Sequence, residues 1–177
     1  ASVDPDRHGP RRFPVKPNIA RSEPGDWANY AKAAVQYLVR CWGQNGPDAE
    51  GTAGMRCLVG GDIPPGAGLS SSSALVVGSA LAFIACNSRG FTPSLDRLAR
   101  LRLAEQMAEA EHYVGTQGGG MDQAICLLGQ AGHALKIDFF PLLTILRSIA
   151  VLAGGWIRGE HHPHPFFELD QPRAQLK

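Results

Sequence analysis

The stretch that most constrains this chain is "GDIPPGAGLSSSSALVVGSALAFIAC", which runs from Gly61 to Cys86. Glycines and serines by themselves would suit a flexible linker, but a linker is polar on both sides. Here a weakly alternating segment over residues 55–63 precedes the glycines, and an uncharged apolar segment follows the serines. This order predicts a strand, a glycine-rich bend and a buried helix.

The bend has the chemistry of an anion site. Glycine lets backbone N–H groups approach a ligand closely, and a helix N-terminus adds unpaired N–H donors and the positive end of the helix dipole. The anion bound at such sites is usually phosphate. No lysine lies between Gly60 and Cys86, so the segment is not a P-loop of the G-x-x-x-x-G-K-[ST] type. A serine-capped buried helix without a ligand explains the same residues, and both interpretations stand at this point.

Two further helices follow from apolar residues at three- and four-residue spacing. The first covers Trp27 to Trp42 and has Asp26 as its N-cap. The second has Thr92 as its N-cap and Pro93 at its first helical position, and it runs to about Val114 before a glycine.

Beyond a second glycine-rich loop at residues 115–120, "MDQAICLL" predicts a short helix. "HALKIDFF", at 133–140, predicts a strand. After Pro141 the composition changes to an apolar segment and then to one rich in histidine, proline and charge.

Composition excludes several classes of protein. With 177 residues, 44% of them hydrophobic, the chain suits one domain or part of a larger one. A net charge of +1 with mixed signs argues against a nucleic-acid-binding face. The apolar run Ala74–Cys86, about 13 residues long, is too short to span a membrane. The four cysteines are scattered, which is typical of free thiols in a reducing compartment, so we expect a cytoplasmic protein.

Two motifs together resemble one family. "PPGAGLSSSSAL" is similar to the phosphate-binding motif of the GHMP kinases, and its serine run favours the galactokinase branch. "AEHYVGTQGGGMDQAI", from Ala110 to Ile125, resembles the active-site segment of galactokinase and N-acetylgalactosamine kinase. "DWANYAKAAVQYL" and "ALKIDFFPL" also fit that family, so the resemblance covers roughly residues 25–141.

The resemblance implies an ATP-dependent sugar 1-kinase with ATP and Mg²⁺ as cofactors. The γ-phosphate would pass to the anomeric hydroxyl of galactose or a related hexose such as N-acetylgalactosamine. It implies a monomer whose partners are ATP and the hexose, with no nucleic acid and no membrane. The implied nucleotide-binding residues are those of the first loop and the helix start: Pro65, Gly66, Ala67, Gly68, Leu69, Ser70, Ser71, Ser72 and Ser73.

The remaining site residues are also implied by motif position. Ser72 and Glu111 would hold Mg²⁺, since hydroxyl and carboxylate oxygens suit that ion. Asp122 would be the catalytic carboxylate that faces the sugar hydroxyl, and Gly119 and Gly120 would contact the sugar ring. Taken singly, these are an ordinary first-turn carboxylate, a helix glutamate and a loose turn.

The expected fold class is α/β, of the α+β type: a truncated GHMP kinase N-terminal domain with a mixed sheet and packed helices. Residues 1–24 are expected to be an extended lead-in with little to pack, residues 25–141 the domain portion, and residues 142–177 a divergent tail. The family's N-terminal sugar-recognition motif, G-R-V-N-x-I-G-E-H-x-D, does not occur in this sequence, and neither does its third, glycine-rich motif. We therefore expect this chain alone to have little activity.

Two other interpretations stay open from the sequence. The chain could be a non-catalytic ATP-binding fragment or a galactokinase-like sugar sensor, and ATP binding without phosphoryl transfer would identify it. It could also be a defective gene product with an appended tail, which the change of composition near Pro141 supports.

Overall fold

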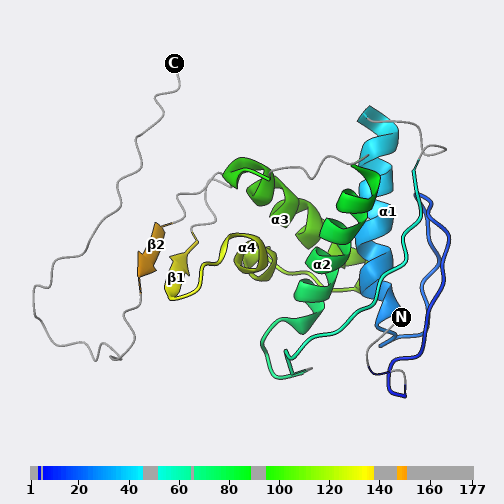
Figure 1. Ribbon diagram of the computed structural model, residues 1–177, viewed down its shortest axis with the longest axis horizontal. Helices are drawn as coiled ribbons and strands as arrows, with labels where there is room; N and C mark the ends of the chain where they lie inside the picture. Colours follow the sequence, from blue (N-terminus) through cyan, green and yellow to red (C-terminus); the bar gives the residue numbers. More distant parts are fainter. Residues whose placement is uncertain are drawn as a thin grey trace, which may run out of the picture. The chain divides into compact units, whose positions relative to one another are not determined.

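The computed structural model describes residues 4, 6–45, 52–64, 66–88, 95–137 and 147–150 (Figure 1). Contacts divide the chain into two units, residues 1–128 and 129–177. Among the described residues, the first unit holds the α-helices α1 (Ala28–Asn45), α2 (Ser71–Asn87), α3 (Arg97–Glu111) and α4 (Met121–Leu128), with the 3-10 helix η2 (His112–Val114) after α3. The second holds two strands, β1 (His133–Lys136) and β2 (Arg147–Ala150).

Helix α1 confirms the predicted first helix and its cap. Asp26 accepts a hydrogen bond through Oδ1 from the backbone N–H of Ala28, at 2.9 Å, which satisfies one of the free donors at the helix start. The buried face repeats every three or four residues, as the sequence pattern requires; it consists of Ala31, Ala34, Val35, Leu38 and Val39.

The segment before α1 is not a loose lead-in, so the expectation that it has little to pack is wrong. Ile19 is only 6% exposed. Three side chains spaced four residues apart on α1 bind this segment. Lys32 donates to Ala20 O at 3.0 Å, Gln36 accepts from the Ile19 N–H at 3.2 Å, and Arg40 donates to Pro17 O at 2.6 Å. A polar stripe along one helix face therefore holds the extended segment in place.

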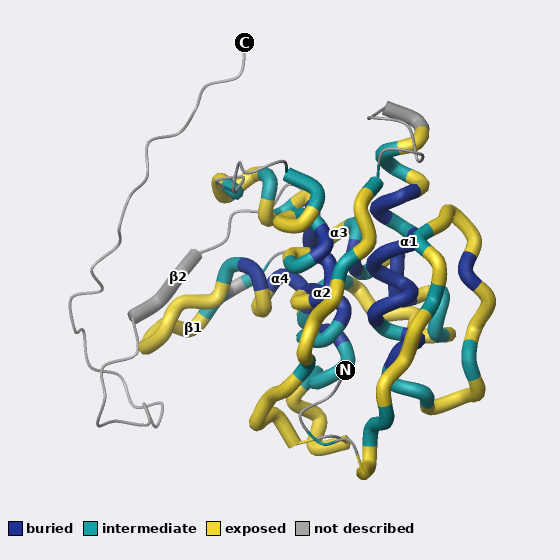
Figure 2. The backbone as a smooth tube through the Cα atoms, turned by 45° about the vertical axis from the view of Figure 1, so that its right-hand side comes forward, coloured by how far each residue is buried: buried dark blue, intermediate teal, exposed yellow. Residues whose placement is uncertain are grey.

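The core lies between α1, α2 and α3, where buried residues face one another (Figure 2). Helix α2 carries no charged residue, and its Phe83 is fully buried and stacks on Trp42 of α1, with ring centroids 5.4 Å apart. Helix α4 packs against both α2 and α3. These contacts fix the start of α2 and the start of α4 relative to α3.

Helix α3 begins later than predicted. Its N-cap is Asp96, whose Oδ1 accepts from the Ala99 N–H at 2.8 Å, so Thr92 is not the cap. Thr92 and Pro93 lie outside the described residues. Aspartate suits the cap position as well as threonine, and the apolar pattern alone did not distinguish the two. The predicted end is confirmed, since η2 closes at Val114 and Gly115 follows with φ of 93°.

The predicted strand at 55–63 is wrong. Within the described segment 52–64 only Val59 forms an isolated bridge, and Leu58 is 69% exposed. Strand β1 confirms the start of the predicted strand at 133–140, while residues 138–140 lie outside the described part. It pairs antiparallel with β2, with Ala134 opposite Ile149. This pair is the sheet of the described residues, so the expected mixed sheet is not confirmed.

The Arg11–Asp26 ion pair predicts an acid-sensitive contribution to stability. Burial would raise the pKa of Asp26, but the Arg11 hydrogen bond at 2.7 Å, the Ala28 N–H, and the Arg11 and Lys32 charges lower it below its usual value. A carboxyl group whose pKa is lowered on folding stabilises the fold at pH values above its unfolded pKa of about 3.9. That contribution to the free energy of unfolding is lost as the pH falls through the folded pKa.

We therefore expect Arg11→Met to reduce the free energy of unfolding at pH 6 and to leave it almost unchanged near pH 2. Urea unfolding across this range would measure the difference, which we expect to stay below about 1 kcal/mol because Arg11 is partly exposed. Arg12→Met is the control, since Arg12 is an exposed neighbour. Equal losses at both pH values would show that Arg11 acts through packing.

Candidate active site

The glycine-rich loop before α2 adopts the backbone conformations that its glycines permit. Gly66 and Gly68 have φ of 73° and 72°. Ser70 lies in the left-handed region with φ of 57°, the one non-glycine residue of the described chain with positive φ. That conformation is unfavourable for serine by about 1–3 kcal/mol, and such outliers concentrate at functional sites. The Ser70 side chain makes no capping hydrogen bond, so it leaves the helix start open.

The first turn of α2 presents unpaired backbone donors. The N–H of Ala74 donates to Ser70 O at 3.0 Å, and the N–H groups of residues 71–73 precede this first helical bond. The loop positions Gly66, Ala67, Gly68 and Leu69 are exposed, and Pro65 lies outside the described residues. A negatively charged group could therefore reach these donors from solvent.

The four serines differ in their surroundings. Ser70, Ser71 and Ser72 are partly exposed, whereas Ser73 is buried. The Ser73 hydroxyl accepts a hydrogen bond from Gln123 Nε2 at 3.3 Å. This bond joins the first turn of α2 to the first turn of α4, so the hydroxyl of Ser73 has a structural partner.

Glu111, the last residue of α3, is the most unusual side chain of the site. It is 2% exposed, and its Oε1 is the one buried side-chain oxygen or nitrogen among the described residues without a hydrogen-bond partner. A buried carboxylate without a partner is strongly unfavourable, and the C-terminal end of a helix dipole makes a negative charge less favourable still. A cation at Oε1 would remove both penalties, and a carboxylate oxygen suits Mg²⁺.

The second glycine loop leads into α4. Gly118 and Gly119 are exposed, and a Cβ built on either would meet no atom within 4 Å. Gly120 has φ of 83°, and a Cβ there would lie 3.4 Å from Cβ of Ala108 on α3. Gly120 therefore permits the close approach of α4 to α3. Asp122 follows in the first turn of α4 and is partly exposed.

The carboxylates of Glu111 and Asp122 both influence the pKa of the Cys126 thiol. Burial raises the pKa of Cys126, and the negative charges of Asp122 and then Glu111 raise it further. The Gln123–Ser73 bond and this shared influence bring the serine run, Glu111 and Asp122 to one end of the α2–α3–α4 cluster. Oε1 of Glu111 makes no hydrogen bond to Ser72. The described residues hold no cluster of three His, Cys, Asp or Glu residues able to bind a metal.

Sequence reasoning missed Gln123. It is buried next to Asp122 and turns inward toward α2. Its spacing of four residues from the buried Leu127 was a signal that it lies on the inner face of α4.

Comparison with known proteins decides the family. The family described as the GHMP kinases N terminal domain matches residues 29–130. The chain belongs to the GHMP kinases. This confirms the resemblance on which the sequence-based site assignment depends.

Similar proteins are galactokinases that are considerably longer than this chain. The galactokinase of Saccharomyces cerevisiae is 37% identical over 122 residues, which are 67% of this chain and 22% of that protein. The galactokinase of Dictyostelium discoideum is 37% identical over 117 residues, 66% of this chain and 21% of that protein. The galactokinase of Canis lupus familiaris is 39% identical over 149 residues, 80% of this chain and 33% of that protein. The chain thus spans between about a fifth and a third of these relatives. None of the helices described has the length and apolarity needed to span a bilayer.

Proposed function

We propose that this chain carries the Mg²⁺-ATP-binding part of the active site of a galactokinase-type sugar 1-kinase. The reaction is transfer of the ATP γ-phosphate to the anomeric hydroxyl of galactose or a related hexose such as N-acetylgalactosamine. The observation that carries the proposal is the buried Oε1 of Glu111, which has no hydrogen-bond partner among the described residues. The galactokinase relatives support the class of substrate.

The nucleotide phosphates bind at the start of α2. Gly66 and Gly68 let the loop curve around the phosphates, and the free N–H groups of Ser71, Ser72 and Ser73 donate to their oxygens. Pro65, Ala67, Leu69 and Ser70 complete the loop. The positive end of the α2 dipole stabilises the negative charge.

Ser72 and Glu111 hold Mg²⁺, which keeps several of its waters. When bound, the ion neutralises charge that develops on the transferred phosphoryl group. Ser72 is suited to this role because its side chain is partly exposed, in contrast to the buried Ser73.

Asp122 orients the sugar hydroxyl and accepts its proton as the phosphoryl group is transferred. Its place in the first turn of α4 sets the carboxylate at the positive end of the helix dipole. Gly119 and Gly120, which carry no side chain, leave room for the sugar ring.

We propose a cytoplasmic monomer with no nucleic-acid or membrane partner, and a division into a lead-in (1–24), a GHMP kinase domain portion (25–141) and a divergent tail (142–177). We also propose that this chain alone binds Mg²⁺-ATP but has little turnover, since the family's sugar-recognition motif does not occur in this sequence. A non-catalytic ATP-binding fragment or sugar sensor is the second candidate.

The test is thermal unfolding of the chain with and without Mg²⁺-ATP, combined with an assay of galactose phosphorylation. We expect Mg²⁺-ATP to raise the unfolding midpoint, and Ser72→Ala to lose the part of this rise that depends on Mg²⁺. Ser71→Ala is the matched control, because it removes a neighbouring hydroxyl and keeps the backbone donor.

Three outcomes decide between the candidates. Galactose turnover that disappears in Asp122→Asn would overturn the expectation of low activity and confirm the kinase. ATP binding with no transfer at all, not even the low turnover expected of this chain, favours the fragment or sensor. A cooperative transition that does not respond to ATP would contradict the nucleotide site.

A further inference from the structure

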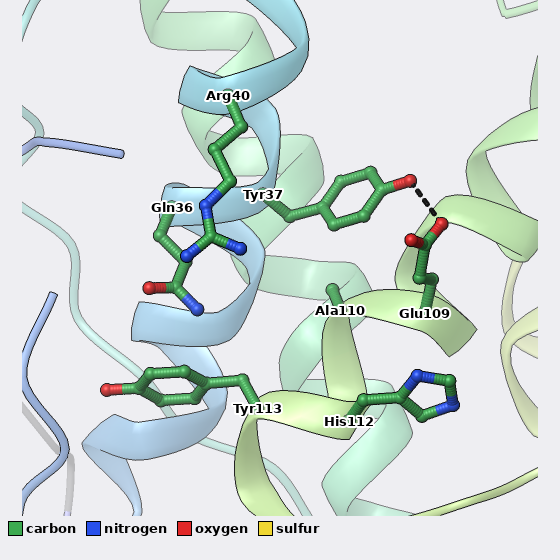
Figure 3. A pocket seen from close by; sticks show the side chains of 7 residues that line it. All are labelled: Gln36, Tyr37, Arg40, Glu109, Ala110, His112 and Tyr113. Atoms are coloured by element: carbon green, nitrogen blue, oxygen red, sulfur yellow. Dashed lines mark hydrogen bonds between the residues drawn. The ribbon is translucent and has the colours of Figure 1, made fainter. Parts of the chain in front are cut away.

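The last turn of α3 carries Glu111, and its inner residues Ala110 and Glu111 are buried. Beside it, toward α1, lies an open pocket of about 260 Å³, lined by Gln36, Tyr37, Arg40, Glu109, Ala110, His112 and Tyr113 (Figure 3). Helix ends fray readily when few contacts hold them. Core packing holds the inner side of this end, so polar contacts are what can fix the side that faces the pocket, where Glu109 is exposed.

Hydrogen bonds to α1 and to the segment before it hold the chain on both sides of Glu111. Before it in the chain, Glu109 Oε2 accepts a hydrogen bond from the Tyr37 hydroxyl of α1 at 2.7 Å, which Figure 3 marks. After it, the Tyr113 hydroxyl donates to Ile19 O of the segment before α1 at 3.1 Å.

Arg21 strengthens the second contact. Its guanidinium lies 5.2 Å from the centre of the Tyr113 ring and donates to His112 O at 3.5 Å. The N–H of Gly115 donates to the same carbonyl at 3.0 Å, which closes η2. The segment before α1 therefore contacts both residues that follow Glu111, His112 and Tyr113.

We propose that Tyr37 and Tyr113 are positioning residues, which clamp the end of α3 so that Oε1 of Glu111 meets the metal ion of the nucleotide. This inference rests on the proposed function. Neither tyrosine touches the ligand; each acts through the backbone of α3 and η2. The clamp adds hydrogen bonds before and after a buried glutamate at the end of a helix.

Both phenols are suited to permanent donation. Burial, and next the hydrogen bond to Glu109, raise the pKa of Tyr37. Burial also raises the pKa of Tyr113, although Arg21 opposes it. Both hydroxyls keep their protons at neutral pH, so the clamp does not open through titration of the tyrosines.

The test compares the whole chain with Tyr37→Phe, Tyr113→Phe and the double variant, with Tyr30→Phe of α1 as the control. Phenylalanine keeps each ring and removes only the hydroxyl. The first measurement is the Mg²⁺ concentration that gives half of the Mg²⁺-dependent stabilisation at fixed ATP. We expect this concentration to rise about 10-fold in the double variant, as for residues that orient a metal ligand, and stabilisation by ATP without Mg²⁺ to be unchanged.

The second measurement is amide hydrogen exchange without any ligand, followed in peptides that cover residues 108–116. Faster exchange there, with unchanged exchange in α2, supports the clamp, whereas a general increase would show a merely structural role and overturn it. Unchanged Mg²⁺ dependence in the double variant would also overturn it. If the original chain shows no response to Mg²⁺-ATP, the proposed function fails, and with it the role of the clamp in metal binding.

Discussion

Replacement of Phe83 by alanine is expected to lower the free energy of unfolding by about 3–5 kcal/mol. Phe83 is fully buried, and its ring stacks on Trp42 with an interplanar angle of 9°. Alanine would remove the apolar surface of the ring and leave a cavity between α1 and α2, because a close-packed core relaxes only in part. Urea unfolding followed by circular dichroism would measure the change.

Two companion variants make this prediction decisive. Leu81→Ala changes a side chain that is 37% exposed on the same helix, and we expect a loss of less than about 1 kcal/mol. Phe83→Leu keeps most of the volume and should unfold cooperatively even if Phe83→Ala does not fold. A loss at Phe83 no larger than at Leu81 would show that α1 and α2 are not packed as described.

The helices could be predicted from the sequence because each buries apolar residues against the others, and the spacing of those residues can be read within a single segment. The face of α1 that holds Val35 and Leu38 is an example, and α2 was expected from its lack of charge. The cap of α3 was misplaced since several polar residues precede the apolar pattern, and capping depends on which one hydrogen-bonds the first turn. Asp96 does so through the Ala99 N–H.

The predicted strand at residues 55–63 was wrong for a different physical reason. A strand is stabilised by partners that are distant in the chain, and alternation within residues 55–63 does not reveal whether such partners exist. Leu58 and Ile63 are exposed in that segment. In β1 and β2 the partners lie close in sequence, and the strand at residue 133 was found.

The prolines of the segment before α1 led us to expect that it makes few packing contacts, which is wrong. Its backbone groups are satisfied by Lys32, Gln36 and Arg40, whose spacing of four residues places them on one face of α1. Polar side chains on a helix usually indicate a solvated face. Here Lys32 and Gln36 are buried, because an extended chain covers them.

The candidate site followed from motif resemblance, and its supporting contacts did not. Gly66, Glu111 and Asp122 lie in recognisable motifs. The contacts made by Gln123 and Tyr113 depend on how α4 and the segment before α1 dock onto α2 and α3. Such contacts join residues far apart in sequence, so no local pattern announces them.

Glu111→Gln is expected to abolish the stabilisation by Mg²⁺-ATP that depends on the metal, about 2.7 kcal/mol when the ligand is at 100 times its dissociation constant. The amide keeps the shape of the side chain but removes the charge that attracts the ion. Without Mg²⁺ we expect the opposite sign, a free energy of unfolding equal to or higher than that of the original chain. The reason is that the variant no longer buries a charged oxygen without a partner.

Urea unfolding with and without Mg²⁺-ATP measures both effects, and Glu105→Gln, an exposed change on the same helix, is the control. A variant that is less stable without Mg²⁺ and still responds to it would show that Glu111 serves the fold and not the metal. The opposite effects on the free energy of unfolding, with and without Mg²⁺-ATP, identify the role of Glu111. Changing a residue that serves packing destabilises the free protein. A residue that serves ligand binding lowers the free energy of unfolding of the free protein, and it raises that free energy only when the ligand is bound.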